Sequence, residues 1–186
     1  MTKLIYSMIT SLDGYIEDKE GKFDWAVPDV KVHSFINNLQ RPIGTYLYGR
    51  LLYETMAVWE TMHSLPELKP EMLDFSELWR GANKIVYSKT LEKVSTSKTR
   101  IERNFDPEMI IEMKTRLGHD ILVGGPNLAA QALKEGLIDE IHLFVCPVLV
   151  GGGKKFFPIN VRLDLELMNE RCFSNGMIYV QYRNKI

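Results

Sequence analysis

The chain alternates strand-like and helix-like segments and then ends in strands alone. Apolar periodicity predicts strands at 3–10, 45–48, 84–88, 121–123 and 139–150, and a final hairpin formed by 165–173 and 177–182. Helices are predicted to follow the first four strands, with starts near residues 29, 49, 72, 107 and 126. Such alternation predicts an α/β fold whose mainly parallel sheet carries helices on both faces. The helix-free end predicts antiparallel strands at the edge of that sheet.

Length and composition limit the function classes. The 186 residues contain no repeat, low-complexity tract or linker, so a single domain over 1–186 is expected. The balance of 23 Lys and Arg against 24 Asp and Glu provides no electrostatic footprint for nucleic acid or an anionic membrane. Two cysteines and four scattered histidines predict neither a disulfide framework nor a metal site. Because no apolar run approaches ~20 residues and the start is strand-like rather than a signal peptide, a cytoplasmic protein is expected.

Three turns follow predicted parallel strands, and such sheets bind ligands at the carboxyl ends of their strands. The turns are Tyr48-Gly49-Arg50, Ser88-Lys89-Thr90 and Gly124-Gly125-Pro126. In the third turn, two glycines let backbone amides approach a ligand, and Pro126 begins a helix whose N-terminus favours a phosphate. The alternative is a tight strand-to-helix turn that binds nothing, and the spacing is not the Gly-x-Gly-x-x-Gly of ordinary dinucleotide folds.

Basic and hydroxyl side chains stand in the other two turns. Arg50 offers a guanidinium that suits bidentate phosphate binding, and Ser88 and Lys89 add donors. Each of these residues alone is typical of a solvated loop. Together at one edge of the sheet, they indicate a ligand that carries several phosphates.

A second glycine cluster, Gly151-Gly152-Gly153, precedes two lysines. A P-loop requires Gly-x-x-x-x-Gly-Lys-Ser/Thr, whereas here Val148 occupies the position of the first glycine and Lys155 replaces the hydroxyl residue. No helix pattern follows the cluster. We therefore interpret it as a structural loop between antiparallel strands.

Asp29 is the candidate acid for proton chemistry, because it continues the inward-facing stripe of Val32 and Ile36. Burial would raise the pKa of a carboxyl at that position, and the group could then hold or donate a proton at neutral pH. Asp at a helix start is also the typical helix cap, and that alternative stays open.

Several motifs, in their order along almost the whole chain, resemble a known family. Ser-Leu-Asp-Gly at 11–14, Val-Gly-Gly-Pro at 123–126 and the run 139–147 that leads into 151–153 resemble the reductase domain of bifunctional riboflavin-biosynthesis deaminase-reductases. That domain is similar to dihydrofolate reductase. The segments 25–28, 49–54 and 157–158 resemble elements of dihydrofolate reductases themselves.

The resemblance implies a dihydrofolate-reductase-like three-layer fold, NADPH as the hydride donor and a homodimer. By the matching motifs, Gly124, Gly125, Asn127 and Leu128 would line the nicotinamide and the pyrophosphate. Gly49 and Arg50 would lie near the phosphates, and Ser88 and Lys89 around the 2′-phosphate. Thr10 and the Asp13-Gly14 turn would border the nicotinamide.

The sequence departs from the family's pattern mainly where the substrate would bind. Val123 stands where riboflavin reductases usually have Glu, and Tyr15 where they tend to have a basic residue. Their segment that handles the phosphoribosyl group is missing after Gly49, and the zinc-binding deaminase half is absent. Asp29 matches the acid of dihydrofolate reductases only with a shift of one residue. The cofactor half therefore carries over better than the substrate half.

With this resemblance, the chain is expected to be an NADPH-dependent reductase that transfers hydride to a C=N or C=O carbon of a pterin- or pyrimidine-like heterocycle. One such substrate is 5-amino-6-(5-phosphoribosylamino)uracil of the riboflavin pathway. Trp25 could stack on the ring, and a core position for this side chain is equally compatible with the sequence. Two other interpretations stay open: a dihydrofolate reductase proper, and a non-catalytic nucleotide-binding protein that kept the cofactor cleft.

Overall fold

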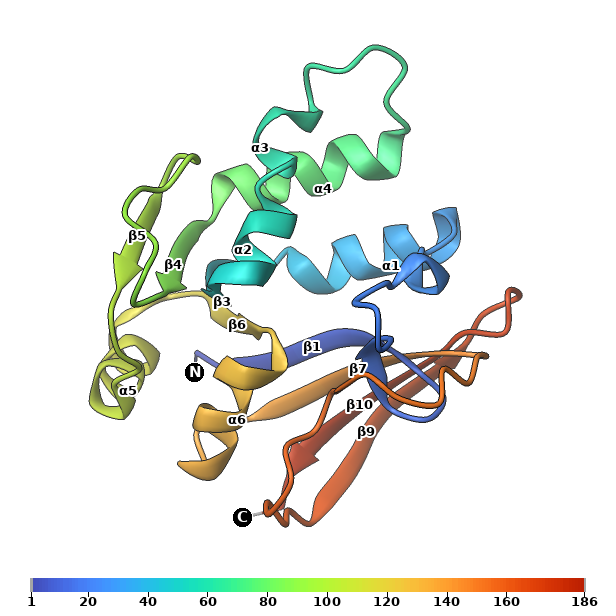
Figure 1. Cartoon of the computed structure of the whole chain (residues 1–186). Helices are drawn as coiled ribbons and strands as arrows, with labels where there is room; N and C mark the ends of the chain where they lie inside the picture. Colours follow the sequence, from blue (N-terminus) through green and yellow to red (C-terminus); the bar gives the residue numbers. More distant parts are fainter. Residues whose placement is uncertain (1, 186) are drawn as a thin grey trace.

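One sheet of eight strands forms the scaffold, in the order β5–β4–β3–β6–β1–β7–β10–β9 (Figure 1). We describe it from a computed structural model, which describes residues 2–185. The strands are β1 (Leu4–Ser11), β3 (Ile43–Gly49), β4 (Asn83–Tyr87), β5 (Thr99–Glu102), β6 (Asp120–Gly124), β7 (Glu140–Cys146), β9 (Leu165–Cys172) and β10 (Ile178–Asn184). From β5 to β7 every neighbouring pair is parallel, and β10 and β9 add antiparallel strands at one edge. The predicted α/β fold is confirmed.

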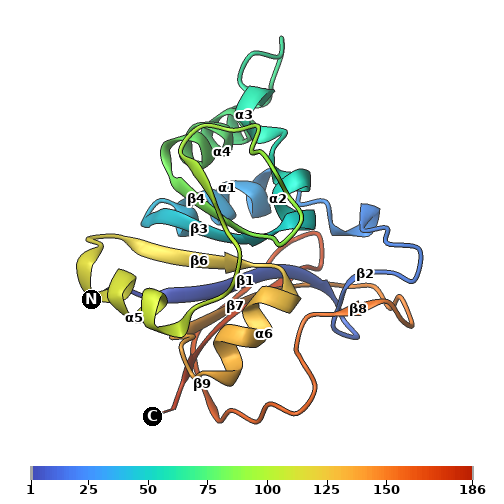
Figure 2. The same ribbon diagram turned by 60° about the vertical axis from the view of Figure 1, so that its left-hand side comes forward.

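Helices cover both faces of the sheet, as the second view in Figure 2 shows. They are the short 3₁₀ helix η1 (Asp24–Ala26) and the α-helices α1 (Val30–Gln40), α2 (Arg50–Met56), α3 (Trp59–Met62), α4 (Pro70–Gly81), α5 (Pro107–Arg116) and α6 (Pro126–Lys134). α5 and α6 lie on one face, and α1 to α4 lie on the other. The molecule therefore has three layers, with the sheet in the middle.

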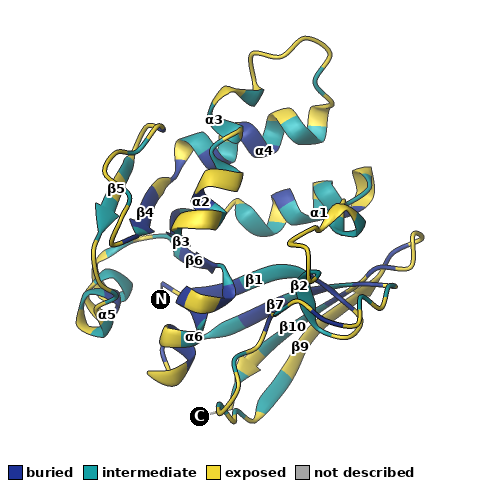
Figure 3. Cartoon of the chain, viewed as in Figure 1, coloured by how far each residue is buried: buried dark blue, intermediate teal, exposed yellow. Residues whose placement is uncertain are grey.

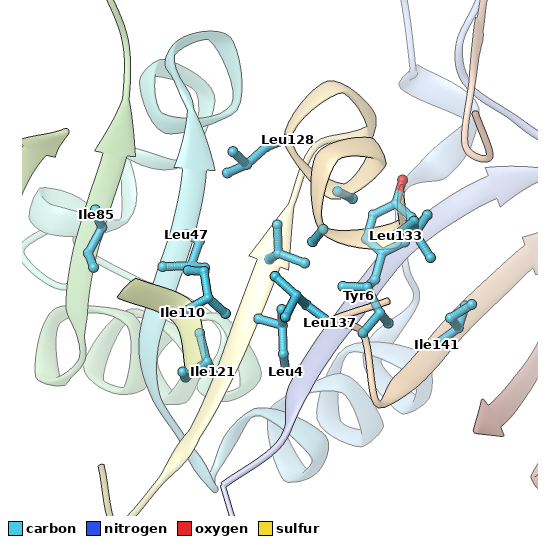
Figure 4. Close-up of a cluster of buried hydrophobic side chains, with 14 of the residues drawn as sticks. Leu4, Tyr6, Leu47, Ile85, Ile110, Ile121, Leu128, Leu133, Leu137 and Ile141 are labelled. Carbon is cyan, nitrogen blue, oxygen red and sulfur yellow. The ribbon is translucent and has the colours of Figure 1, made fainter. Parts of the chain in front are cut away.

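The central strands are buried on both faces because successive side chains point to opposite sides. On one face Leu4 and Leu47 pack with Ile110 of α5 and Leu128 of α6 (Figure 4). On the other face, the buried cluster contains Tyr46, Tyr48, Val86, Phe75 and Trp79. Figure 3 shows that exposed residues gather on the outer sides of the helices and on the loops. This two-sided burial explains why the strands read as nearly continuous apolar runs.

A second, two-stranded sheet pairs β2 (Tyr15–Glu17) antiparallel with β8 (Lys154–Lys155). The glycines at 151–153 connect β7 to β8 and so join two different sheets, which corrects the expectation of a loop between antiparallel neighbours. A Cβ on Gly153, whose φ is +127°, would lie 2.0 Å from the backbone oxygen of Glu17. The cluster is thus a structural loop, and it requires glycine because it packs directly against β2.

Besides β2 and β8, which no predicted strand covers, three segments differ from the sequence prediction. β7 ends at Cys146 rather than at residue 150, because Pro147 has no N–H to donate to a ladder. The helix predicted from residue 49 is divided, since α2 ends at Met56 and α3 begins at Trp59. β5 lies outside every predicted strand, because Ile101 is the one apolar residue among its four.

Candidate functional site

The three predicted ligand-binding turns come to one edge of the sheet. β4, β3, β6 and β1 are neighbours and run parallel, so their carboxyl ends face the same way. Gly49 pairs with Tyr87, and Tyr48 pairs with Gly124, so the three turns begin at nearly the same level. The structure therefore places Arg50, the Ser88-Lys89 turn and the Gly124-Gly125 turn side by side, although they are far apart in the sequence.

β1 extends beyond the end of β6 and leaves a step in the sheet. Its last partner on the β6 side is the pair of Tyr6 with Val123, whereas on the other side it pairs with β7 as far as Ser11 and Cys146. Among the described residues, no strand pairs with Ser7–Ser11 on the β6 side. Thr10 lies buried in this part of β1. Unpaired backbone N–H and C=O groups in this step can bind a flat ring that carries an amide.

The glycine turn at the end of β6 is tightly built. A Cβ on Gly124 would lie 2.5 Å from Cδ2 of Leu52 and 3.1 Å from the ring of Tyr48. Gly125 has a φ of +88°, a conformation that side-chain-bearing residues rarely adopt. Pro126 then begins α6, whose first backbone N–H groups remain open to a ligand. Asn127 is exposed beside them, while the side chain of Leu128 is buried in the core, so Leu128 offers a ligand its backbone alone.

Arg50 bridges α2 and the turn after β4. Its Nε donates to Oε1 of Glu54 at 2.7 Å, and one of its terminal nitrogens donates to Oγ1 of Thr90 at 3.1 Å. The Arg50 side chain is about half exposed, at 48%. Lys89 is exposed in the same turn. These cations stand at the open edge of the sheet, where a phosphate could reach them.

Ser88 has a role that its sequence position did not reveal. It is buried, and its hydroxyl oxygen accepts hydrogen bonds from the N–H groups of Thr90 at 3.3 Å and Leu91 at 3.0 Å. Arg103, directly after β5, donates to the carbonyl oxygens of Ser88 at 2.8 Å and Leu91 at 2.7 Å. Ser88 thus organises the turn. Arg103 could not be identified from the sequence, because it follows β5, a strand with almost no apolar pattern.

The Asp13-Gly14 turn at the end of β1 is tied to the loop after β7. The carboxylate of Asp13 accepts hydrogen bonds from the N–H groups of Val150 at 3.2 Å and Gly151 at 2.8 Å. The Ser11 hydroxyl, followed by these two amides, holds the pKa of Asp13 below its usual range. Asp13 therefore shapes the end of the candidate site, and its carboxylate is directed to the loop.

Asp29 and Trp25 lie at the start of α1 and in η1, which contacts β1. Asp29 is the N-cap residue of α1, and its Oδ1 accepts the N–H of Val32 at 2.9 Å. This is the geometry of the helix-cap alternative, and it occupies one of the two carboxylate oxygens. Trp25 packs against the buried cluster that includes Phe144 and Tyr179, as the core alternative requires. Its buried indole N–H has no hydrogen-bond partner among the described residues.

Other features lie away from this edge. An open hollow of about 640 Å³ is lined by Thr2, Leu117 and Asp120 near the amino ends of the strands, at the opposite end of the sheet.

Within residues 2–185, no three His, Cys, Asp or Glu side chains are grouped to hold a metal ion. None of the described helices is both long and apolar enough to span a membrane.

Comparisons with known proteins place this geometry in a family. Residues 2–179 match the model of the RibD C-terminal domain. The chain is 31% identical over 184 residues to the uncharacterised protein YyaP of Bacillus subtilis, covering 97% of this chain and 94% of that protein. A Shewanella sp. PV-4 structure, provisionally named a riboflavin biosynthesis protein, has 22% identity and a TM-score of 0.76, with 100% of both chains covered.

Two further structures share the fold. The Thermotoga maritima deaminase and 5-amino-6-(5-phosphoribosylamino)uracil reductase has 16% identity and a TM-score of 0.65, with 99% of this chain and 57% of that chain covered. Enterococcus faecalis dihydrofolate reductase, in a complex with NADP(H), has 12% identity and a TM-score of 0.63, with 99% and 97% covered. The fold is therefore dihydrofolate-reductase-like, and the chain belongs to the RibD C-terminal domain family.

Proposed function

We propose that the chain is an NADPH-dependent reductase that transfers a hydride to a C=N or C=O carbon of a small heterocyclic substrate. The proposal rests on one observation. The glycine turn before α6, Arg50 and the Ser88-Lys89 turn end adjacent parallel strands, beside the unpaired side of β1. A helix N-terminus and basic side chains suit phosphates, and unpaired strand groups suit an amide-bearing ring. A phosphorylated nicotinamide dinucleotide contains both parts.

Different residues would hold the phosphate groups. The first backbone amides of α6, with Gly124, Gly125, Asn127 and the backbone of Leu128, would bind the pyrophosphate. The Cβ that Gly124 lacks would crowd Leu52 and Tyr48, so the turn keeps its backbone bare on this edge. Gly49 and Arg50 would add an open helix start and a positive charge, while Ser88 and Lys89 would surround the 2′-phosphate.

The step in the sheet would receive the nicotinamide. Backbone groups of β1 from Ser7 onward, with Thr10, would bind its carboxamide. The Asp13-Gly14 turn would border the ring, and its bonds to the loop after β7 would help to exclude water. When bound, the nicotinamide supplies the hydride, and the protein supplies position and a proton.

Hydride transfer to a C=N or C=O carbon requires a proton on the neighbouring heteroatom. Asp29 uses Oδ1 as a helix cap, so Oδ2 is the atom that would hold a proton or orient a water molecule. The substrate would lie between Asp29 and β1. The indole N–H of Trp25 would donate to it, or the ring would stack on it.

A pyrimidine- or pterin-like ring is the proposed substrate class. The name of the Thermotoga maritima relative includes a ribosylaminouracil reductase, which supports the pyrimidine. Dihydrofolate is the second candidate, supported by the fold shared with the Enterococcus faecalis enzyme. We also propose that the chain is a single-domain subunit of a cytoplasmic homodimer. Sedimentation analysis tests the oligomeric state.

Thermal unfolding with NADPH and with NADH tests the cofactor. A ligand at 100 times its dissociation constant stabilises the folded state by ~2.7 kcal/mol, and we expect that effect from NADPH. Oxidation of NADPH is then followed with dihydrofolate and with the ribosylaminouracil as separate substrates. Absence of stabilisation by both dinucleotides would contradict the reductase. Binding of NADPH without turnover on either substrate or on related heterocycles would favour the non-catalytic nucleotide-binding protein.

A further inference from the structure

The loop 88–91 is held in one conformation by bonds from several directions. Within the loop, the hydroxyl of Ser88 accepts two backbone N–H groups, those of Thr90 and Leu91. From β5, the carbonyl of Glu102 accepts the N–H of Ser88 at 3.0 Å. From α2, Arg50 reaches the hydroxyl of Thr90. This loop is therefore an organised structure before any ligand arrives.

Arg103 closes the loop by joining its two ends. A single terminal nitrogen of its guanidinium donates to the carbonyls of Ser88 and Leu91. The residue is exposed and follows β5 directly, so it reaches the loop from the solvent side. Because one nitrogen bonds both carbonyls, Arg103 sets the distance between the first and last residues of the loop, and Lys89 lies between them.

On the basis of the proposed function, we propose that Arg103 is a positioning residue that determines the preference for NADPH over NADH. The two dinucleotides differ only in the 2′-phosphate, which Ser88 and Lys89 would bind. Arg103 acts through the loop, because its two observed bonds go to loop carbonyls. A preorganised loop binds the phosphate without the entropy cost of ordering its backbone.

Arg100 provides a matched control for this role. It stands on β5, three residues before Arg103, and it is also an exposed arginine. Its Nε donates to Oε1 of Glu102 at 3.0 Å, which lies on its own strand. Substitution of either arginine by methionine removes the same charge. An effect of long-range electrostatics would therefore be present in both variants, and an effect of loop positioning only in Arg103→Met.

Dissociation constants for NADPH and NADH, measured with both variants, give the first test. We expect Arg103→Met to weaken NADPH binding about tenfold, a change of about 1.4 kcal/mol, with NADH binding within about twofold of the unmodified chain. Arg100→Met is expected to keep the original ratio. Equal losses in the two variants, or an unchanged ratio in Arg103→Met, would overturn the proposal. Binding of neither dinucleotide to the unmodified chain would overturn the proposed function and this inference with it.

Amide hydrogen exchange of the ligand-free protein provides a second test that does not depend on cofactor binding. We expect faster exchange at Thr90 and Leu91 in Arg103→Met, while Ile85 in the centre of β4 stays unchanged. Unchanged exchange at both amides would show that Arg103 does not organise the loop.

The variant Ser88→Ala removes the other loop anchor without a change of charge. We expect the effects of Ser88→Ala and Arg103→Met on the ratio of NADPH to NADH affinity to be non-additive, because both residues hold the same loop.

Discussion

The carboxylate of Asp13 and the backbone N–H of Gly151 form a hydrogen bond of 2.8 Å across 138 positions of the chain. Val150 donates to the other oxygen at 3.2 Å, and the N–H of Leu12 donates to the carbonyl of Val148 at 2.8 Å. These three hydrogen bonds hold the turn after β1 against the loop after β7. Because β1 carries the unpaired side that would receive the nicotinamide, these bonds define the end of the candidate site.

Removing the Asp13 carboxylate should loosen this end of the site. Asp13→Ala deletes both acceptors, so we expect a lower melting temperature and weaker NADPH binding. Asp13→Asn keeps one acceptor oxygen, so its melting temperature and NADPH affinity should lie between those of Asp13→Ala and the unmodified chain. Glu77→Ala, at an exposed acid of α4 outside the three turns, serves as the control for loss of charge. Melting temperatures and NADPH affinities that are equal in Asp13→Ala and the unmodified chain would show that the fastening is dispensable.

Gly153 should tolerate no side chain. A Cβ there would lie 2.0 Å from the backbone oxygen of Glu17, and backbone cannot move aside as a flexible side chain can. We expect Gly153→Ala to lower the free energy of unfolding by at least about 1–3 kcal/mol. Gly81→Ala is the matched control, because a Cβ at Gly81 would have no neighbour within 4 Å and the φ of this residue is ordinary. Denaturant unfolding measures the stability of both variants. Equal free energies of unfolding for Gly153→Ala and Gly81→Ala would contradict the close packing of Gly153 against Glu17.

Gly124 faces a movable neighbour, which permits a rescue experiment. The Cβ of Gly124→Ala would lie 2.5 Å from Cδ2 of Leu52, the end of a flexible side chain. We expect a loss of about 1–3 kcal/mol in unfolding free energy and weaker dinucleotide binding, because Leu52 is displaced beside the turn. In the double variant with Leu52→Ala, the two losses should be less than additive, since the clash is removed. Strict additivity in denaturant unfolding would argue against this contact.

The parallel sheet could be predicted because its central strands are apolar on both faces. β1, β3, β4, β6 and β7 are apolar runs. The Asp106 cap of α5 and the prolines that begin α5 and α6 mark the helices. β5 could not be predicted, since it lies at the sheet edge and its stability comes from pairing with β4 rather than from apolar side chains. The division between α2 and α3 is a tertiary effect with no glycine or proline to signal it.

The candidate site also has parts that the sequence could predict and parts that it could not. The three turns could be predicted to share an edge, because parallel strands fix the direction of their ends. The bond from Asp13 to Gly151 could not, since a carboxylate paired with a backbone amide leaves no pattern at either position. The role of Arg103 could not be predicted either, because it depends on the position of β5. The roles of Asp29 and Trp25 stay predictions, because the structure gives each a packing or capping contact that is compatible with either role.

Lys84 should make stability rise with pH. Its side chain is buried, donates to the carbonyls of Trp79 and Ala82, and burial lowers its pKa from 10.5 to about 8. Between these values the unfolded chain binds more protons, so the free energy of unfolding increases as pH rises through the window.

The difference between the unmodified chain and Lys84→Met isolates this contribution from titrating tyrosines. We expect that difference to shift in favour of the unmodified chain by roughly 1–3 kcal/mol from pH 8 to pH 10. Lys134→Met is the control, because this exposed lysine at the end of α6 is not among the charges that act on Lys84, so its difference from the unmodified chain should stay constant across the window. A constant difference across the window would mean that Lys84 is not held in a destabilised charged form.

Glu140 should make the protein sensitive to acid. The His142 ring at 3.1 Å and the Lys3 ammonium at 2.6 Å lower the pKa of its carboxyl from 4.5 to about 2. Gln181 donates to the same carboxylate at 2.9 Å. The stabilisation is therefore fully present above pH 4.5 and is lost as pH falls towards 2, because the unfolded carboxyl takes up its proton first.

Glu140→Gln removes the charge and keeps an amide oxygen that can accept from Gln181. We expect this variant to be less stable than the unmodified chain at pH 7 by on the order of 2 kcal/mol, with the two stability curves converging as pH falls below 4.5. Glu77→Gln, at an exposed position of α4, should give a curve parallel to that of the unmodified chain. Because Glu140 begins β7 at the end of the sheet opposite to the candidate site, NADPH affinity at pH 7 should stay unchanged. Parallel curves for Glu140→Gln would show that His142 and Lys3 do not stabilise the charged carboxylate.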